Sequence, residues 1–398
     1  MDVRTQFFTY GEDAESRLLL HDGSDFGPVT LAYETFGTLN PEKDNAVLVY
    51  HALSGSQHLA GTNPAVPGVG DRWDVSCRTG WWDDFVGPGK AVDTDKFYVI
   101  CANYLGGCYG STGPSSINPE NGKPYGGDFP QIALADIVDS QLPLYDELGI
   151  TTFHAAIGSS LGGMLALNFA ARYPERVKRV IPVATGLAST TLTRVHNLEQ
   201  ILAIENDPNF CDGHYYDGPP PLRGLALARM ISHKTFVSLH HMEARMTDRC
   251  EQEQDEFSWY KIRTPLESYI LHQGRKFLRR FDANTYLQLL SAWTGFNLVR
   301  DMGCTDYREV FADCGHQEYL LFSIDSDCCF YPEEQELLRD ELRGAGLKVD
   351  YVSVSSDKGH DSFLLEPELY TEPIKRMLEK ENRRATPGSV LCAQAGLS

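Results

Sequence analysis

Several features that would define a class of protein are missing from this 398-residue chain. No apolar run approaches the roughly 20 residues that span a membrane. The N-terminus, Met1–Phe7, lacks the basic-then-apolar pattern of a secretory signal. No H-E-x-x-H, Walker A or G-x-G-x-x-G pattern occurs, so we expect neither a bound metal nor a nucleotide cofactor.

Cysteine pairs and positive charge are also scarce. Ten cysteines are scattered without a C-x-x-C pair, which predicts free thiols in the reducing cytoplasm. The net charge is −20, which argues against binding to nucleic acid or to an anionic membrane surface. A local basic pocket for an anionic ligand remains compatible with this charge.

What the chain does contain is an alternation of strand-like and helix-like segments. Short apolar runs of the kind found in buried parallel strands recur along it. This alternation predicts an α/β fold with a mostly parallel sheet. The expected strands are Val29–Thr35, Ala46–Tyr50, Phe97–Ala102, Phe153–Ile157, Val180–Ala184, Tyr319–Ile324 and Lys348–Val354.

The alternation stops between residues 187 and 304. This interval shows helical periodicity, as in Leu222–Ile231 and Tyr286–Trp293, and no clear strand. We interpret it as a helical lid inserted into a discontinuous core of residues 1–186 and 305–380, although an independent helical domain would show the same pattern. Residues 381–398 are expected to form a flexible tail.

The motif Gly158-Ser159-Ser160-Leu161-Gly162 lies between an expected strand and an expected helix. G-x-S-x-G in this context is the nucleophile elbow of α/β-hydrolases, in which a strained turn exposes the serine hydroxyl. A chance match is on the order of one in ten chains of this length, but the strand and helix on either side favour the elbow. Ser160 is therefore the candidate nucleophile.

A serine nucleophile needs a histidine base and an orienting carboxylate, which follow in the order Ser, Asp or Glu, His on this fold. Asp327 follows the expected strand Tyr319–Ile324, and His360 follows the next one. The carboxyl ends of neighbouring parallel strands share one edge of a sheet, so the two loops should be adjacent. Asp325 and Glu333 are rival carboxylates, less well placed beyond the strand end.

The oxyanion hole should combine two backbone N–H groups. One belongs to the residue after the nucleophile, Leu161, and the other to a loop after an early strand. Leu53, in the turn after Ala46–Tyr50, is the candidate for the second donor.

Taken together, these motifs resemble the homoserine O-acetyltransferase family over about residues 15–380. The resemblance is carried by the elbow and by several further segments, namely Leu31–Asn40, Asn45–Gly55, Gly80–Lys90, Asn103–Pro114, Ser268-Tyr269, His272–Gly274, Arg280–Asn284 and Gly359–Leu364. It implies an α/β-hydrolase core, a helical lid and a homodimer formed through the lid.

The resemblance also implies a reaction and its site residues. Acetyl would pass from acetyl-CoA, a co-substrate, to the hydroxyl of L-homoserine through acyl-Ser160, in methionine biosynthesis. Ser160, Asp327 and His360 would form the triad, Leu53 and Leu161 the oxyanion hole, and Asp361 would hold the substrate amino group. Transfer of acetyl or succinyl to serine or another hydroxyl metabolite, a plain esterase, and a catalytically silent binding module are the alternatives.

Two positions depart from the family pattern. The arginine expected to bind the substrate carboxylate aligns with Ile201, which leaves Arg194 and Arg229 as unranked substitutes. Relatives that use succinyl tend to have Trp-Arg-Phe after the triad aspartate, whereas this chain has Cys328-Cys329-Phe330, which favours acetyl. The adjacent cysteines are interpreted as small packing residues, with redox sensing as the alternative.

Overall fold

The computed structural model describes residues 1–244 and 261–380, so the predicted tail at 381–398 lies outside the described residues. An eight-stranded sheet runs through the molecule in the order β1-β4-β8-β5-β9-β10-β11-β12. β1 and β8 each pair antiparallel with β4, and the other neighbours pair in parallel. The strands are β1 (Gln6–Tyr10), β4 (Val29–Phe36), β5 (Ala46–Tyr50), β8 (Tyr98–Ala102), β9 (Ala155–Ser159), β10 (Arg179–Val183), β11 (Glu318–Ile324) and β12 (Lys348–Val354).

All seven expected strands are therefore present, within two residues at each end. β1 was not predicted. It lies at the edge of the sheet and is only partly buried. Two short ribbons complete the strand set, β2 (Leu18–Leu19) with β3 (Asp25–Phe26) and β6 (Val86–Gly87) with β7 (Val92–Asp93).

Both faces of the sheet are covered, which explains the continuously apolar strands. In β5, Leu48 and Tyr50 belong to one hydrophobic cluster, and Val47 and Val49 belong to the cluster on the opposite face. Side chains alternate along a strand, so a strand covered on both sides must be apolar throughout. α1 (Leu134–Glu147), α2 (Leu161–Arg172) and α10 (Pro332–Gly344) supply the first cluster, and α12 (Pro367–Leu378) packs on the second.

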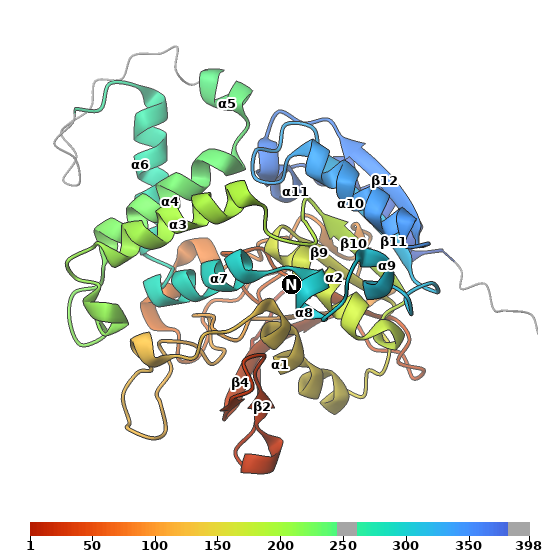
Figure 1. Cartoon of the computed structure of the whole chain (residues 1–398), viewed down its shortest axis with the longest axis horizontal. Coiled ribbons are helices and arrows are strands. Elements are labelled where there is room, and N and C mark those ends of the chain that lie inside the picture. The colour runs from red at the N-terminus through yellow and green to blue at the C-terminus, as the bar shows by residue number, and fades with distance from the viewer. Residues whose placement is uncertain (245–260, 381–398) are drawn as a thin grey trace, which may run out of the picture.

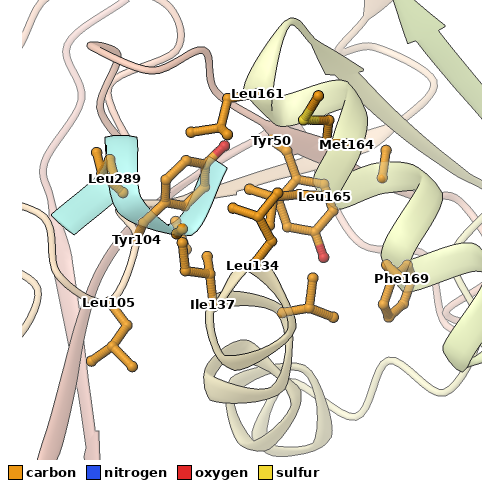
Figure 2. Close-up of a cluster of buried hydrophobic side chains, with 14 of the residues drawn as sticks. Tyr50, Tyr104, Leu105, Leu134, Ile137, Leu161, Met164, Leu165, Phe169 and Leu289 are labelled. Atoms are coloured by element: carbon orange, nitrogen blue, oxygen red, sulfur yellow. The ribbon is translucent and has the colours of Figure 1, made fainter. Parts of the chain in front are cut away.

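Figure 2 shows part of the first cluster, with side chains from α1, α2 and β5. Phe169 of α2 packs against Tyr50 from β5, with their ring centroids 6.4 Å apart, and Leu161 of α2 lies beside Tyr104. α2 is buried along nearly its whole length. The segment that begins at Ser160 is therefore held by the core of the protein.

The interval from 187 to 304 contains only helices and loops in its described part. α3, α4 and α6 pack together on one side of the molecule, away from α10 and β12 (Figure 1). α7 packs into the cluster that covers the sheet, through Leu289, Leu290 and Trp293. The interval holds α3 (Thr191–Glu205), α4 (Leu222–Phe236), α5 (Leu239–Ala244), α6 (Pro265–Leu278), α7 (Ala283–Gly295) and α8 (Leu298–Asp301).

The boundaries of the core and the role of the insertion as a lid stay predictions. The short helices α9 (Tyr307–Val310) and α11 (Ser362–Leu365) complete the set. None of the helices in residues 1–244 and 261–380 is long and apolar enough to cross a membrane.

Candidate active site

Ser160 lies at the sharp turn between β9 and α2. Its φ of 55° and ψ of −124° are unusual for a residue with a side chain. Its N–H donates to the carbonyl of Val183 at 2.9 Å, which ties the turn to the neighbouring strand. The observed backbone is thus the strained strand-to-helix turn that the G-x-S-x-G motif predicts.

The flanking glycines are required because backbones approach closely at this turn. A Cβ on Gly158 would lie 2.0 Å from the carbonyl oxygen of Gly162, and one on Gly162 would lie 2.3 Å from that of Tyr50. Real contacts of this kind do not occur, so neither position accepts a larger residue without movement of the backbone.

Asp327 and His360 form a buried, hydrogen-bonded pair. His360 Nδ1 lies 2.7 Å from Asp327 Oδ2, and both side chains are almost fully buried. The second carboxylate oxygen, Oδ1, accepts the backbone N–H groups of Cys329 at 2.7 Å and Phe330 at 2.9 Å. These bonds hold the carboxylate in one orientation, and the carboxylate in turn orients the imidazole.

The electrostatics of this pair suit a general base. Burial disfavours the imidazolium, but the charge and hydrogen bond of Asp327 outweigh it and raise the pKa of His360 above its ordinary value. The other ring nitrogen, Nε2, is buried and has no hydrogen-bond partner within the described chain. Ser160 and His360 line the same cavity of about 270 Å³.

Leu53 also lines this cavity, and Leu161 opens α2 directly after Ser160. The described residues offer no hydrogen-bond acceptor to the N–H of either one. Residues on other segments hold the turn around Leu53 through its carbonyls: Arg280 donates to Ser54 at 3.0 Å and Trp81 donates to Ser56 at 2.9 Å. Two free N–H groups next to a serine hydroxyl are the elements of an oxyanion hole.

Asp361 and Arg229 place opposite charges in the same cavity. Burial raises the pKa of Asp361, although the charges of His360 and Arg229 oppose the shift. The guanidinium of Arg229 lies over the rings of Phe277 and Phe236, 4.8 and 5.1 Å from their centroids. Its Nη1 is buried, and no described residue forms a hydrogen bond with it.

This arrangement ranks the two arginines that the sequence offered in place of the one missing at Ile201. Ile201 lies on α3 and packs against the hydrophobic core. Of the two substitutes, Arg194 donates to the carbonyl of Ser189 and is absent from the cavity wall, whereas Arg229 lines it. The sequence could not rank them because the packing of α4 over the site is a tertiary feature.

Cys328 and Cys329 are absent from the wall of the cavity that holds Ser160. They line a second cavity of about 230 Å³, on the α3 side of the Asp327 loop. Burial raises the pKa of both thiols, which makes them poor nucleophiles and agrees with a packing role. The rival carboxylate Asp325 accepts the N–H of Ser356, and Glu333 is exposed in the first turn of α10.

Among the lining residues that were not singled out as site residues from the sequence are Gln273, Lys276 and Arg280. All three fall within or beside segments that carry the family resemblance, and this was the signal by which the sequence could have identified them as site residues. In the described parts of the chain, no cluster of His, Cys, Asp and Glu has the makings of a metal site.

Comparisons with known proteins agree with this geometry. The family model of the α/β hydrolase fold matches residues 45–367. The homoserine O-acetyltransferase of Solidesulfovibrio magneticus is 42% identical over 382 residues, covering 95% of this chain and 93% of that protein. That of Symbiobacterium thermophilum is 43% identical over 368 residues, covering 92% and 93%.

Solved structures give the same picture. Homoserine O-acetyltransferase from Bacillus anthracis superposes with a TM-score of 0.83 at 27% identity, covering 96% of this chain and 99% of that one. Esterase E22 has a TM-score of 0.81 at 27% identity, covering 94% and 100%. The fold thus serves both acyl transfer and ester hydrolysis.

Proposed function

The chain belongs to the homoserine O-acetyltransferase family of the α/β-hydrolase fold, and we propose that it transfers acetyl from acetyl-CoA to the hydroxyl of L-homoserine, in methionine biosynthesis. One observation carries the proposal beyond family membership. The cavity that holds Ser160 and the His360–Asp327 pair also contains Asp361 and Arg229, opposite charges that match the amino and carboxylate groups of an amino acid.

In the first half-reaction, Ser160 Oγ attacks the thioester carbonyl while His360 Nε2 takes the hydroxyl proton. The oxyanion that forms accepts hydrogen bonds from the N–H groups of Leu53 and Leu161. Collapse of this intermediate breaks the C–S bond, His360 returns the proton to the departing sulfur, and CoA leaves. The product is acetyl-Ser160.

In the second half-reaction, homoserine replaces CoA. Asp361 binds its ammonium group and Arg229 its carboxylate, which places the hydroxyl beside His360. His360 removes the hydroxyl proton, the oxygen attacks the acetyl carbonyl, and Ser160 leaves with the proton returned by His360. A lid that excludes water would favour this transfer over hydrolysis.

A thiol-release assay tests this proposal. Purified protein receives acetyl-CoA alone, with homoserine, or with serine, and free CoA is followed over time. We expect a stoichiometric burst without acceptor, sustained turnover with homoserine, and no turnover in Ser160→Ala. Sustained release with serine alone would identify a serine acyltransferase instead.

Ester hydrolysis is the second candidate, because esterase E22 shares the fold at comparable similarity. Equal CoA release with and without homoserine would favour it. The paired charges of Asp361 and Arg229 argue for the transferase, since a plain ester has neither an ammonium group nor a carboxylate for them to bind.

The partner proposed for the lid is a second copy of the chain. Along α3, Leu192, Val195, Leu198 and Leu202 are 58, 50, 51 and 45% exposed, and their spacing places them on one helix face. Apolar stripes of this kind indicate a protein interface. Leu198→Glu should produce monomers in sedimentation analysis, while Leu365→Glu, at an exposed position on α11, should not. An unchanged dimer in Leu198→Glu would contradict this face.

The compartment we propose remains the cytoplasm. The eight cysteines in the described residues are free thiols, as suits a reducing environment.

A further inference from the structure

The end of α6 and the residues after it present polar side chains to the mouth of the active-site cavity. Gln273 and Lys276 are three residues apart on α6, which places them on one helix face, and Arg280 follows just beyond the end of α6. All three line the cavity. Lys276 is exposed, whereas Ser160 and His360, on the same cavity wall, are 4 and 2% exposed. Lys276 therefore lies on the solvent side of the cavity wall, and the reacting residues lie in its interior.

The charge of this wall is opposite to that of the chain as a whole. Among the described residues that line the cavity, Asp361 is the sole carboxylate, against the cations Arg229, Lys276 and Arg280. The whole chain has a net charge of −20. A cationic mouth on an acidic protein attracts anionic ligands to that place.

The three side chains differ in whether they already have hydrogen-bond partners within the protein. Arg280 Nη1 donates to the carbonyl of Ser54 at 3.0 Å and to the hydroxyl of Tyr109 at 3.1 Å, so Arg280 positions the turn that carries Leu53. Within residues 1–244 and 261–380, Gln273 and Lys276 form no side-chain hydrogen bond or ion pair. The ammonium of Lys276 is therefore free to bind a ligand at the rim.

The size of the cavity indicates which part of a ligand reaches this rim. Its volume of about 270 Å³ lies at the lower end for small-molecule sites. It is large enough for an acyl group with part of a pantetheine arm, but too small for a nucleotide as well. A CoA thioester with its carbonyl at Ser160 must leave its nucleotide and phosphates at the mouth.

We propose that Lys276, with Gln273 beside it, binds the phosphate groups of the CoA donor at the mouth of the cavity. The proposal rests on the proposed function, since it takes a CoA thioester as the donor. An ammonium group binds phosphate as a point charge without strict geometry, which suits a flexible donor. The contact would favour CoA thioesters over small acetyl esters that react with the same serine.

The test compares donors with and without phosphates at saturating homoserine. Acetyl-CoA carries a diphosphate and a 3′-phosphate, acetyl-dephospho-CoA lacks the 3′-phosphate, and S-acetylpantetheine lacks both groups. We expect Lys276→Gln to raise KM for acetyl-CoA roughly fivefold, the upper range for an exposed ion pair, with little change in kcat. For S-acetylpantetheine, kcat/KM should be unchanged.

The matched control is Arg279→Gln, which removes one positive charge from an exposed neighbour that does not line the cavity. It should leave every KM unchanged, and Lys276→Arg should restore most of the affinity for acetyl-CoA. A KM for acetyl-dephospho-CoA that is unaffected by Lys276→Gln assigns the contact to the 3′-phosphate, and an equal rise assigns it to the diphosphate.

Two results would overturn the proposal. One is an equal effect of Lys276→Gln and Arg279→Gln on acetyl-CoA, which would indicate general charge alone. The other is an equal loss for all three donors in Lys276→Gln, which would indicate a structural role. Failure of the proposed function is distinguishable, because the unmodified protein would then show no homoserine-dependent transfer with any donor.

Discussion

Replacement of Asp327 by asparagine separates the two tasks of this carboxylate. In the structure, Oδ1 accepts the N–H groups of Cys329 and Phe330, and Oδ2 accepts from His360 Nδ1. An asparagine side chain has a single oxygen, and the two backbone donors hold that oxygen on their side. The amide NH₂ group then faces His360 Nδ1, which must become an acceptor, and the ring proton moves to Nε2.

The magnitudes follow from these contacts. With Nε2 protonated, His360 cannot take the proton of Ser160, and we expect kcat to fall about 10⁴-fold, as for a triad histidine held in the wrong tautomer. Folding should suffer little, because asparagine keeps both backbone bonds and costs about 1 kcal/mol. Asp327→Ala loses three hydrogen bonds at about 1 kcal/mol each, so it should lose about 3 kcal/mol of stability.

The assay pairs homoserine-dependent CoA release with urea denaturation. Asp325→Asn is the matched control: it changes a carboxylate at the end of the same strand that binds only the N–H of Ser356 among described partners, and its kcat should equal that of the unmodified protein. A kcat for Asp327→Asn within tenfold of the unmodified value would refute the triad assignment. Equal stability of Asp327→Asn and Asp327→Ala would refute the role of the backbone bonds.

Three further predictions concern the base, the elbow and the acceptor. The pKa of His360 is raised and its neutral form is the base, so kcat/KM should rise with pH through a midpoint above about 6.5; a pH profile from 5 to 9 with a midpoint below 6 would contradict this. Gly162→Ala places a Cβ 2.3 Å from the carbonyl oxygen of Tyr50 and should cost about 3 kcal/mol in urea denaturation, whereas a stability near that of the parent would show that the turn relaxes. Arg229→Gln should raise KM for homoserine by at least roughly tenfold without a comparable change for acetyl-CoA, and Arg194→Gln should leave both unchanged; the reverse ranking would return the carboxylate site to α3.

The fold was predictable because each buried strand has a recognisable apolar pattern in its own short segment of sequence. Strands covered on both faces must be apolar throughout, so β5, β9 and β11 were evident as short runs. β1 was missed because one side of it is exposed and its edge position relaxes the pattern. Its pairing with β4 is a contact between segments about twenty residues apart, which periodicity does not encode.

Some residues of the candidate site were likewise predictable from the sequence, and others were not. Ser160, Asp327 and His360 were expected because the topology places the ends of successive parallel strands at one edge of the sheet. Arg229 could not be chosen over Arg194, because that choice depends on how α3 and α4 pack over the cavity. The position of Cys328 was equally beyond the sequence, since the Asp327 loop turns this residue toward a different cavity.

The sequence by itself determined the strand order along the chain, the elbow at Ser160 and the order of the triad. Each of these features depends on a short segment whose residue pattern is set by local structure. Only the tertiary structure decided that Arg229 lines the wall with Asp361, that the Asp327 carboxylate is held by Cys329 and Phe330, and that Lys276 stands at the mouth. These features depend on contacts between segments distant in the chain. These contacts are set by side-chain direction and packing, which no local sequence pattern specifies.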